Sequence, residues 1–447
     1  MKPNHLTILG GGPAGLAVAY FARKHRLPFT LYEASDRIGG NAATLRRGDF
    51  LFDTGAHRFH DKDPEITQEV KQLLGDELVK VHAQSQIYFD GKMIDFPPSP
   101  FNLLKNLGLF TCLKAALELV KSRLDSTDPE ANFENFALKM YGKTLADCFL
   151  LRYSEKLWGV PCRQLSPVVS GKRLKGLGLN TFFIEALFGR RAKTQHLEGS
   201  FYYPQRGYGS IVEKLAAYCG ENQIRRGARI TQVFHTGQRI QAIEINGRER
   251  IETEQVVNTL PLPFFLELMA PSPPQEILSA ARTLRFRNLI LVAIFLNKQS
   301  VNPYATVYFP NPDVPFTRIY EPRNRSRLMA PPGKTSLVAE IPCWRGDTLW
   351  KLEDAKLAGL VQAELLRIGW VNEKEIIDTC VYRMENTYPV IETGVEERRE
   401  RISGYLSCFE NLKISGRSGQ FTYTHVHDML RFGKDIIEDY IQPTTNF

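Results

Sequence analysis

A glycine-rich turn near the start of the chain carries the first residues with recognisable chemistry. Gly10, Gly12 and Gly15 follow an apolar run at residues 5–9 and precede an alanine-rich stretch at residues 16–24. A strand, a glycine turn and a helix in this order are typical of dinucleotide-binding folds. The turn lets the backbone approach a pyrophosphate, and the start of the helix offers it free N–H groups and a positive dipole end. We therefore expect this turn to contact a dinucleotide through Gly10, Gly12, Pro13, Ala14 and Gly15.

An acidic residue closes the next apolar run. Glu33 follows residues 28–32 and lies 18 residues after Gly15. A carboxylate at this place can accept hydrogen bonds from the two hydroxyls of an adenosine ribose, and it disfavours a 2′-phosphate. The first 33 residues thus predict a strand, a phosphate-binding turn, a helix and a strand that ends at the ribose.

The segment after Glu33 identifies the dinucleotide. It continues as Glu33-x-x-x-Arg37-x-Gly39-Gly40, followed by Asn41. A second glycine pair permits another close approach of the backbone, and Arg37 adds a cation near the phosphates. This pattern resembles the extended FAD fingerprint of the flavoproteins that include amine oxidases, phytoene desaturases, protoporphyrinogen oxidases and UDP-galactopyranose mutases. The resemblance implies FAD, held without a covalent bond, and contacts to it from Arg37, Gly39, Gly40 and Asn41.

A histidine loop extends the resemblance. The sequence Gly39-Gly40-Asn41, followed by Gly55-Ala56-His57-x-Phe59-His60, is similar to that of the UDP-galactopyranose mutases, and Phe52-Asp53-x-Gly55-x-His57 is shared more widely in the group. In the mutases this loop lies against the flavin ring. The resemblance implies that His57 is adjacent to the flavin and is the candidate catalytic residue. A loop histidine without a chemical role is the alternative.

Later segments resemble further cofactor contacts. Residues 227–261 are similar to the ribbon that returns the chain to the nucleotide domain, which implies that Val233 lies at the adenine. Residues 416–419, Gly-Arg-Ser-Gly, and the start of a final helix at residues 429–440 resemble the part that closes over the flavin. The cofactor contacts expected there are Gly416, Arg417, Asp428 and Met429.

A set of arginines and aromatic residues suggests an anionic substrate. A diphosphate is bound well by planar, always-charged guanidinium groups and by phenol donors. The order and the local sequence of the set resemble the substrate contacts of the mutases, especially the eukaryotic type. His427, in place of an asparagine, and a different tail depart from the bacterial type. The implied substrate contacts are Trp158, Arg173, Tyr308, Arg318, Tyr388 and Tyr423.

The length of 447 residues predicts two or more subdomains. We expect an α/β protein with a discontinuous Rossmann-like FAD-binding domain, a helical cap and a second, mixed or antiparallel β-sheet domain for the substrate. Asp90-Gly91 and Asn246-Gly247 predict hairpin turns, and residues 289–297 predict a strand of the second sheet. The expected parts are FAD-binding segments at 1–96, 201–285 and 405–447, the cap at 97–200 and the substrate sheet at 286–404.

The composition excludes several classes of protein. Charged residues make up 24% and hydrophobic residues 43%, which is ordinary for a globular chain. The formal charge of +8 suits anionic small molecules, and nothing in the sequence matches a nucleic-acid motif. The spacing of His57 with His60, or of His425 with His427, would allow metal ligation, but no partner carboxylate or cysteine pattern supports it. Seven scattered cysteines and apolar runs too short to span a bilayer predict a soluble, cytoplasmic protein. Residues 101–124 form a basic amphipathic segment, for which we expect a lid or packing role, with peripheral membrane contact as the alternative.

Two enzymatic hypotheses remain. The first is redox-neutral, mutase-like chemistry of reduced flavin on a nucleotide-linked sugar, for which NAD(P)H is a candidate external reductant. The second is an FAD-dependent oxidase, dehydrogenase or desaturase that acts on an amine, a porphyrin-like or a lipid-like substrate. A flavin-binding protein without activity is a third hypothesis. The oligomeric state does not follow from the sequence.

Overall fold

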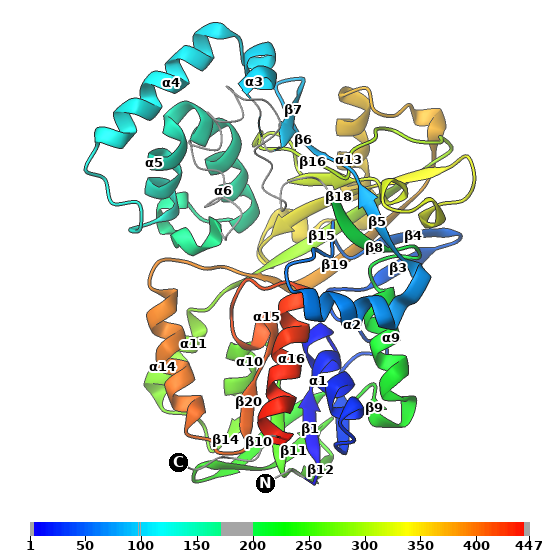
Figure 1. Cartoon of the computed structure of the whole chain (residues 1–447), viewed down its shortest axis with the longest axis vertical. Helices are drawn as coiled ribbons and strands as arrows, with labels where there is room; N and C mark the ends of the chain where they lie inside the picture. The colour runs from blue at the N-terminus through cyan, green and yellow to red at the C-terminus, as the bar shows by residue number, and fades with distance from the viewer. Residues whose placement is uncertain (1–3, 97, 99, 171–199, 442–447) are drawn as a thin grey trace.

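A parallel sheet forms the centre of the lower half of the molecule in Figure 1. The structure is a computed structural model that describes residues 4–96, 98, 100–170 and 200–441. The sheet has five strands in the order β20-β13-β1-β2-β9, and all neighbours run parallel. Leu6 of β1 lies opposite Phe29 of β2 and Gln255 of β13. Its strands are β1 (Leu6–Leu9), β2 (Phe29–Tyr32), β9 (Ile224–Arg225), β13 (Gln255–Asn258) and β20 (Leu412–Ile414).

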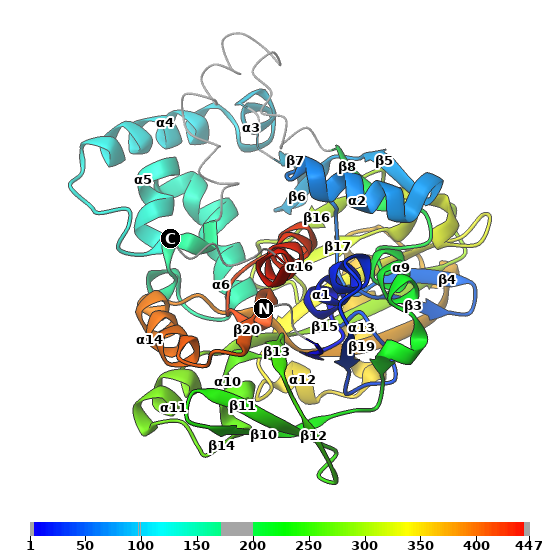
Figure 2. The ribbon, with the colours of Figure 1, turned by 60° about the horizontal axis from the view of Figure 1, so that its bottom comes forward.

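Helices from the two ends of the described chain cover one face of this sheet. In α1 (Pro13–Lys24), every residue from Ala14 to Ala22 is buried. The last helix, α16 (Val426–Ile441), packs against α1 so closely that a Cβ on Gly433 would lie 2.8 Å from Ala17. α9 (Ser210–Cys219) packs beside α1, and the views in Figures 1 and 2 agree on this arrangement. The discontinuous Rossmann-like fold expected from the sequence is confirmed.

A smaller sheet lies behind the parallel sheet. It has the order β12-β11-β10-β14, and its apolar side chains share a core with Leu9, Tyr32 and Val256. Asn246 (φ +55°) and Gly247 (φ +67°) form the predicted turn between β11 and β12. The elements of this region are β10 (Ile230–Thr236), β11 (Arg239–Ile245), β12 (Glu249–Glu252), β14 (Met269–Ala270), α10 (Leu262–Glu267), α11 (Gln275–Arg282) and α14 (Val395–Ser407).

A second large sheet occupies the other half of the molecule. It has seven strands in the order β19-β15-β18-β17-β16-β6-β7. β16 pairs in parallel with β6, and the other neighbouring strands are antiparallel, so the expected mixed sheet is confirmed. Helix α13 (Asp354–Arg367) packs on one of its faces. The strands are β6 (Ser85–Phe89), β7 (Lys92–Phe96), β15 (Phe286–Leu296), β16 (Thr306–Tyr308), β17 (Arg318–Tyr320), β18 (Thr335–Cys343) and β19 (Ile376–Pro389).

The hairpin β6–β7 belongs to this second sheet. Its turn is the predicted one, with Asp90 at φ +50° and Gly91 at φ +76°. We expected residues 1–96 to belong to the nucleotide-binding part, but β6 pairs with β16, from Ser85 with Thr306 to Ile87 with Tyr308. The pairing joins segments more than 200 residues apart, and local sequence does not encode such a contact.

Helices cap the second sheet at one end of the molecule. The amphipathic segment at residues 101–124 is two helices, α3 (Pro100–Leu107) and α4 (Leu109–Leu124), which are broken at Gly108 (φ +82°). They lie over α5 (Phe133–Leu145) and α6 (Arg152–Trp158) (Figure 1). Among the described residues, no helix is both long and apolar enough to cross a bilayer. The remaining elements include α2 (Pro64–Leu74), α12 (Thr348–Lys351), α15 (Gly416–Gly419), β3 (Thr44–Arg47), β4 (Phe50–Asp53), β5 (Leu78–His82) and β8 (Ser200–Pro204).

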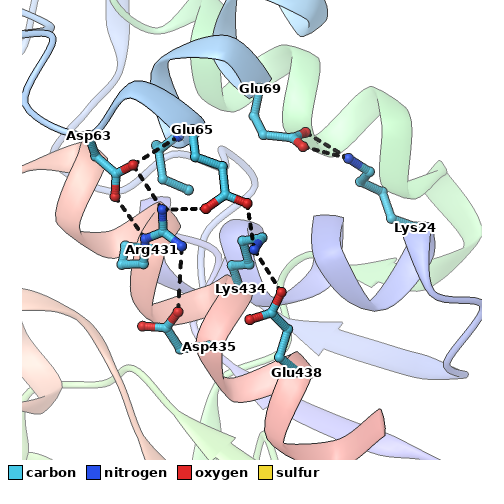
Figure 3. A network of polar contacts seen from close by, with 9 residues as sticks. Lys24, Asp63, Glu65, Glu69, Arg431, Lys434, Asp435 and Glu438 are labelled. Atoms are coloured by element: carbon cyan, nitrogen blue, oxygen red, sulfur yellow. Dashed lines mark hydrogen bonds and ion pairs between the residues drawn. The ribbon is translucent and has the colours of Figure 1, made fainter. Parts of the chain in front are cut away.

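An ionic network joins α16 to the start of α2 (Figure 3). Asp63 caps α2 by accepting a hydrogen bond from the N–H of Ile66. Arg431 of α16 reaches both oxygens of the same carboxylate, at 2.7 and 2.8 Å, and Glu65 at 2.7 Å. Lys434 bridges Glu65 and Glu438, with both contacts at 2.7 Å. The network fixes the last helix against the element that follows the His57 loop.

Candidate functional site

A cavity of about 350 Å³ lies where the carboxyl ends of the parallel strands face the second sheet. Residues of both sheets and the start of α16 line it. Most of the predicted site residues come together here, although they are spread over more than 400 positions of the sequence. The predicted residues that line the cavity are Gly10, Gly12, Pro13, Ala14, Glu33, Gly40, Asn41, His57, Tyr308, Arg318, Tyr388, Gly416, Arg417, Tyr423 and Met429.

The glycine turn leaves room for a ligand at one position and for none at another. A Cβ on Gly12 would meet nothing within 4 Å, whereas a Cβ on Gly15 would lie 1.9 Å from the carbonyl oxygen of Gly10. Gly12 therefore faces open space at the N-terminus of the 12-residue helix α1, and Gly15 allows this helix to pack on the turn. Such an open position before free helical N–H groups fits a pyrophosphate.

The second glycine pair packs on the first turn. A Cβ on Gly40 (φ +50°) would lie 3.3 Å from the Cα of Gly12. Glu33 holds the adjoining backbone, because its carboxylate accepts hydrogen bonds from the N–H of Gly11 at 2.7 Å and from the N–H of Ser35 at 2.9 Å. Arg37 lies outside the cavity: it is exposed and donates to the hydroxyl of Tyr382 at 2.9 Å.

The C-terminal segment closes the same space. Gly416 (φ +82°) approaches α1 so closely that a Cβ on it would lie 2.6 Å from the Cβ of Ala14. The guanidinium of Arg417 donates to the carbonyl oxygen of Thr424 and lies 4.9 Å from the ring centre of Tyr423. Met429 on the first turn of α16 lines the cavity. Asp428 instead supports the turn by accepting from the N–H of His425 at 2.7 Å.

The ring of His57 stacks on Tyr208, with centroids 4.9 Å apart and planes at 23°. Burial, followed by the positive charges of Arg417 and Arg318, lowers the pKa of His57 to about 3. The imidazole is therefore neutral at neutral pH. Its Nε2 is buried and has no hydrogen-bond partner among the described residues. A neutral ring that lines the cavity fits a positioning role better than proton transfer.

The substrate residues predicted on the second sheet converge on Arg318. Tyr308 lies opposite Arg318 in the β16–β17 pair, and the hydroxyl of Tyr388 accepts a hydrogen bond from Arg318 at 3.0 Å. Trp158 does not line the cavity, but its ring packs 6.2 Å from that of Tyr388 and 5.8 Å from that of Tyr423. Arg173 lies outside the described residues.

Three other predicted cofactor residues do not line the cavity. Gly15 and Gly39 lie behind it, where Gly15 packs against Gly10 and a Cβ on Gly39 would lie 2.7 Å from the side chain of Val212. Val233 is fully buried on β10, in the core that the ribbon shares with the parallel sheet. The structure thus brings no side-chain atom of Val233 to the cavity.

Glu340 is a central residue that reasoning from the sequence missed. It is fully buried on β18, forms an ion pair with Arg318 at 2.6 Å and accepts the N–H of Ala56 at 2.8 Å. Burial lowers the pKa of Arg318, but the charge of Glu340, the neighbouring Tyr388 and Tyr153 and the hydrogen bond to Glu340 together more than offset this, so that the pKa lies well above its usual range. A lone acid inside the apolar strand of residues 335–343 was the available signal.

Asp53 is a second buried acid near the site. Its carboxylate accepts hydrogen bonds from the hydroxyl of Tyr203 at 2.6 Å, from Thr44 at 2.7 Å and from the N–H of Tyr208 at 2.9 Å. Because these bonds set the backbone at Tyr208, Asp53 places the ring on which His57 stacks. Among the described residues, no group of three or more His, Cys, Asp or Glu side chains could hold a metal ion.

These features fit an FAD molecule. The glycine turn faces open space, Glu33 lines the cavity beyond it, and the neutral ring of His57 lines the region between the two sheets. When bound, FAD would contact the glycine turn, Glu33, Gly40, Asn41 and the start of α16.

Comparisons with known proteins agree with this geometry. Residues 13–396 match the family model described as flavin containing amine oxidoreductase. The coproporphyrinogen III oxidase of Bacillus subtilis (strain 168) is 21% identical and covers 98% of this chain and 97% of its own length. A crystal structure of reduced UDP-galactopyranose mutase has a TM-score of 0.85 with 19% identity, and covers 98% of this chain and 93% of that chain. Wild-type putrescine oxidase bound to putrescine has a TM-score of 0.69 with 15% identity, over 98% of this chain and 99% of its own.

Proposed function

The chain belongs to the flavin containing amine oxidoreductase family and is an FAD-dependent enzyme, and from this premise we propose that its substrate is an anionic, nucleotide-linked sugar. The reaction proposed is like that of the UDP-galactopyranose mutases. The flavin, when bound, supplies the redox-active ring on which this chemistry depends. The chain supplies binding and orientation.

The observation that carries the proposal is the wall of cationic and phenolic side chains that lines the cavity. Arg318 and Arg417 line it together with Tyr308, Tyr388 and Tyr423. Burial raises the pKa of Tyr388, so its hydroxyl stays protonated and can donate at neutral pH. Guanidinium groups and phenol hydroxyls are the donors that a diphosphate prefers.

Glu340 holds Arg318 in place within this set, and its charge offsets part of that of the guanidinium. Its carboxylate fixes one nitrogen of Arg318, while the buried Nε of Arg318 has no hydrogen-bond partner within the described part of the chain. The neutral ring of His57 would position the flavin, and the proposed chemistry asks no general acid of it.

The test is UDP binding to the flavin-loaded protein, in oxidised and dithionite-reduced forms, followed by flavin fluorescence. Arg318→Ala should weaken UDP binding by about 2 kcal/mol or more, because a charged hydrogen-bonding partner is lost. Arg323→Ala is the matched control, since Arg323 donates to backbone carbonyls of Pro331 and Lys334 and does not line the cavity. Unchanged UDP affinity in Arg318→Ala would remove that residue from the site.

Product analysis then tests the reaction. The reduced, flavin-loaded protein is incubated with UDP-galactopyranose, and the sugar nucleotides are separated by chromatography. A ring-contracted isomer that forms only with reduced flavin supports the proposal. We also propose NAD(P)H as the external reductant, and anaerobic bleaching of the flavin by NADH or NADPH checks this separately.

A second candidate function is oxidation of a porphyrinogen. It is favoured by the coproporphyrinogen III oxidase of Bacillus subtilis, which aligns over 98% of this chain. The same arginines and phenols could hold carboxylates. Oxygen consumption with coproporphyrinogen III, together with no binding of UDP in either flavin state, would favour this reaction over the mutase-like one.

A further inference from the structure

An apolar stripe runs along the outward face of α4. Leu109, Leu113, Leu117, Val120 and Leu124 recur at helical spacing, and all are exposed, by 73% for Leu117 and 85% for Leu124. Exposed aromatic side chains extend the stripe onto the neighbouring turns: Phe101 on α3 and Phe110 on α4, which is 91% exposed. Contiguous apolar surface of this kind marks an interaction site on a folded protein.

The opposite face of α4 is already packed. Ala115 and Leu119 are buried, and a Cβ on Gly142 of α5 would meet the backbone of α4 at Leu119 within 3.0 Å. Figures 1 and 2 both show α4 at the periphery of the molecule with α5 on its inner side. The outward stripe is therefore not used to hold α4 on the described part of the fold.

The charged residues around the stripe indicate the chemistry of the surface that it would contact. On a helical projection of 100° per residue, Lys114 and Lys121 flank one side of the stripe and Arg123 flanks the other. Glu118 is the only acid among residues 100–124. It projects to the opposite side, where it accepts the N–H of Thr144 at 2.6 Å and lies 3.9 Å from the ammonium of Lys114, which remains exposed. An apolar face with a cationic rim and no acid in it complements anionic lipid headgroups above an acyl layer.

We propose that the outward face of α3 and α4 docks on the surface of an anionic lipid bilayer. The 16 residues of α4 would lie in the plane of the surface, with the leucines in the acyl boundary and the lysines at the headgroups. A second copy of this chain suits the face less well, since it would bring the same cationic rim against itself. The inference is independent of the substrate.

The experiment is co-sedimentation of the flavin-loaded protein with phosphatidylglycerol vesicles and, separately, with phosphatidylcholine vesicles at low ionic strength. We expect binding to the anionic vesicles, and weakening as salt is raised. Leu113→Gln with Leu117→Gln should weaken the binding tenfold or more. Glutamine leaves the net charge unchanged, and its helix propensity is close enough to that of leucine for α4 to stay folded. Leu328→Gln with Leu360→Gln is the matched control, because these leucines are exposed on other elements.

Three results would overturn the proposal. The first is no sedimentation of the wild-type chain with phosphatidylglycerol vesicles at low salt. The second is equal loss of binding in the Leu113/Leu117 variant and in the Leu328/Leu360 control. The third is a wild-type dimer that Leu113→Gln with Leu117→Gln converts to a monomer, which would assign the face to contact between copies. Flavin absorbance of each variant reports that the fold is intact.

Discussion

At the scale of single residues, Gly12 and Gly15 have different tasks: Gly12 borders the open space for the ligand, and Gly15 allows α1 to pack on the turn. Gly12→Leu should yield a folded but colourless protein, because the side chain enters open space that we assign to the pyrophosphate. Gly15→Leu should fail to fold, since its Cβ would overlap the carbonyl oxygen of Gly10. The ratio of flavin to protein absorbance, with circular dichroism for folding, measures both effects.

Gly346→Leu is the control for these substitutions. A Cβ on Gly346 would also meet nothing within 4 Å, but this glycine is exposed on a turn and does not line the cavity. This variant should remain yellow. A fully flavinylated Gly12→Leu protein would contradict the assignment of the glycine turn to the cofactor.

His57 predicts an acid sensitivity of the fold. Its pKa is lowered from an ordinary value of 6.5 to about 3, so the unfolded chain takes up this proton at a higher pH than the folded chain. The contribution of His57 to the free energy of unfolding is therefore fully present above pH 6.5 and is lost as the pH falls toward 3. At about pH 5 the loss amounts to about 2 kcal/mol.

His57→Phe, which keeps a ring against Tyr208, should remove this part of the acid response. Urea unfolding of both proteins at pH 7 and pH 5 measures it. The wild-type chain should lose about 2 kcal/mol more than the variant between the two conditions. Equal losses would mean that the imidazole of His57 titrates normally in the folded protein.

At the scale of elements, the network between α16 and α2 should stabilise the closed end of the cavity. Arg431→Met takes the paired cation from Asp63 and one of two cations from Glu65, which keeps Lys434, and should lower the free energy of unfolding at pH 7 by about 1–2 kcal/mol. A hydrogen bond from Arg431 lowers the pKa of Asp63, so this contribution is present above the ordinary carboxyl pKa and is lost as the carboxylates take up protons.

Urea unfolding should therefore show a difference in the free energy of unfolding between the wild-type chain and Arg431→Met at pH 7. This difference should become smaller below about pH 4. Lys413→Met is the control. It removes a single, more exposed ion pair with α16, in which Lys413 of β20 lies 3.2 Å from Asp439. It should cost less than about 0.5 kcal/mol. If the difference in free energy of unfolding between Arg431→Met and the wild-type chain stays constant with pH, the effect of the substitution comes from packing.

Elements with local signals could be predicted from the sequence. The turn at Gly10 to Gly15, the hairpins at Asn246-Gly247 and Asp90-Gly91, and strand β15 need only neighbouring residues to specify them. The pairing of β6 with β16 could not be predicted, because it depends on contacts across the whole chain. The same holds for the ion pair of Glu340 with Arg318, whose partners lie on neighbouring strands but carry no shared local pattern.

At the scale of the whole molecule, one ligand should stabilise both sheets together. The cavity is lined from residue 10 to residue 429, so FAD would connect segments of both halves. FAD at 100 times its dissociation constant should add about 2.7 kcal/mol to the stability of the apoprotein. Thermal unfolding of apoprotein at increasing FAD concentrations checks this, and Gly12→Leu should show no shift. An equal shift in that variant would place FAD elsewhere.

The parallel sheet also has a consequence for biosynthesis. Its strand β1 is made long before β20 completes the sheet and before α16, which ends at residue 441, covers α1. At about 5–20 residues per second, a ribosome needs roughly 20–90 s for the intervening chain. During this time the apolar face of α1 lacks the helix that covers it, so the nascent chain offers a binding site for chaperones. Because Met429 of α16 lines the cavity, the complete cavity forms only after this residue has been made.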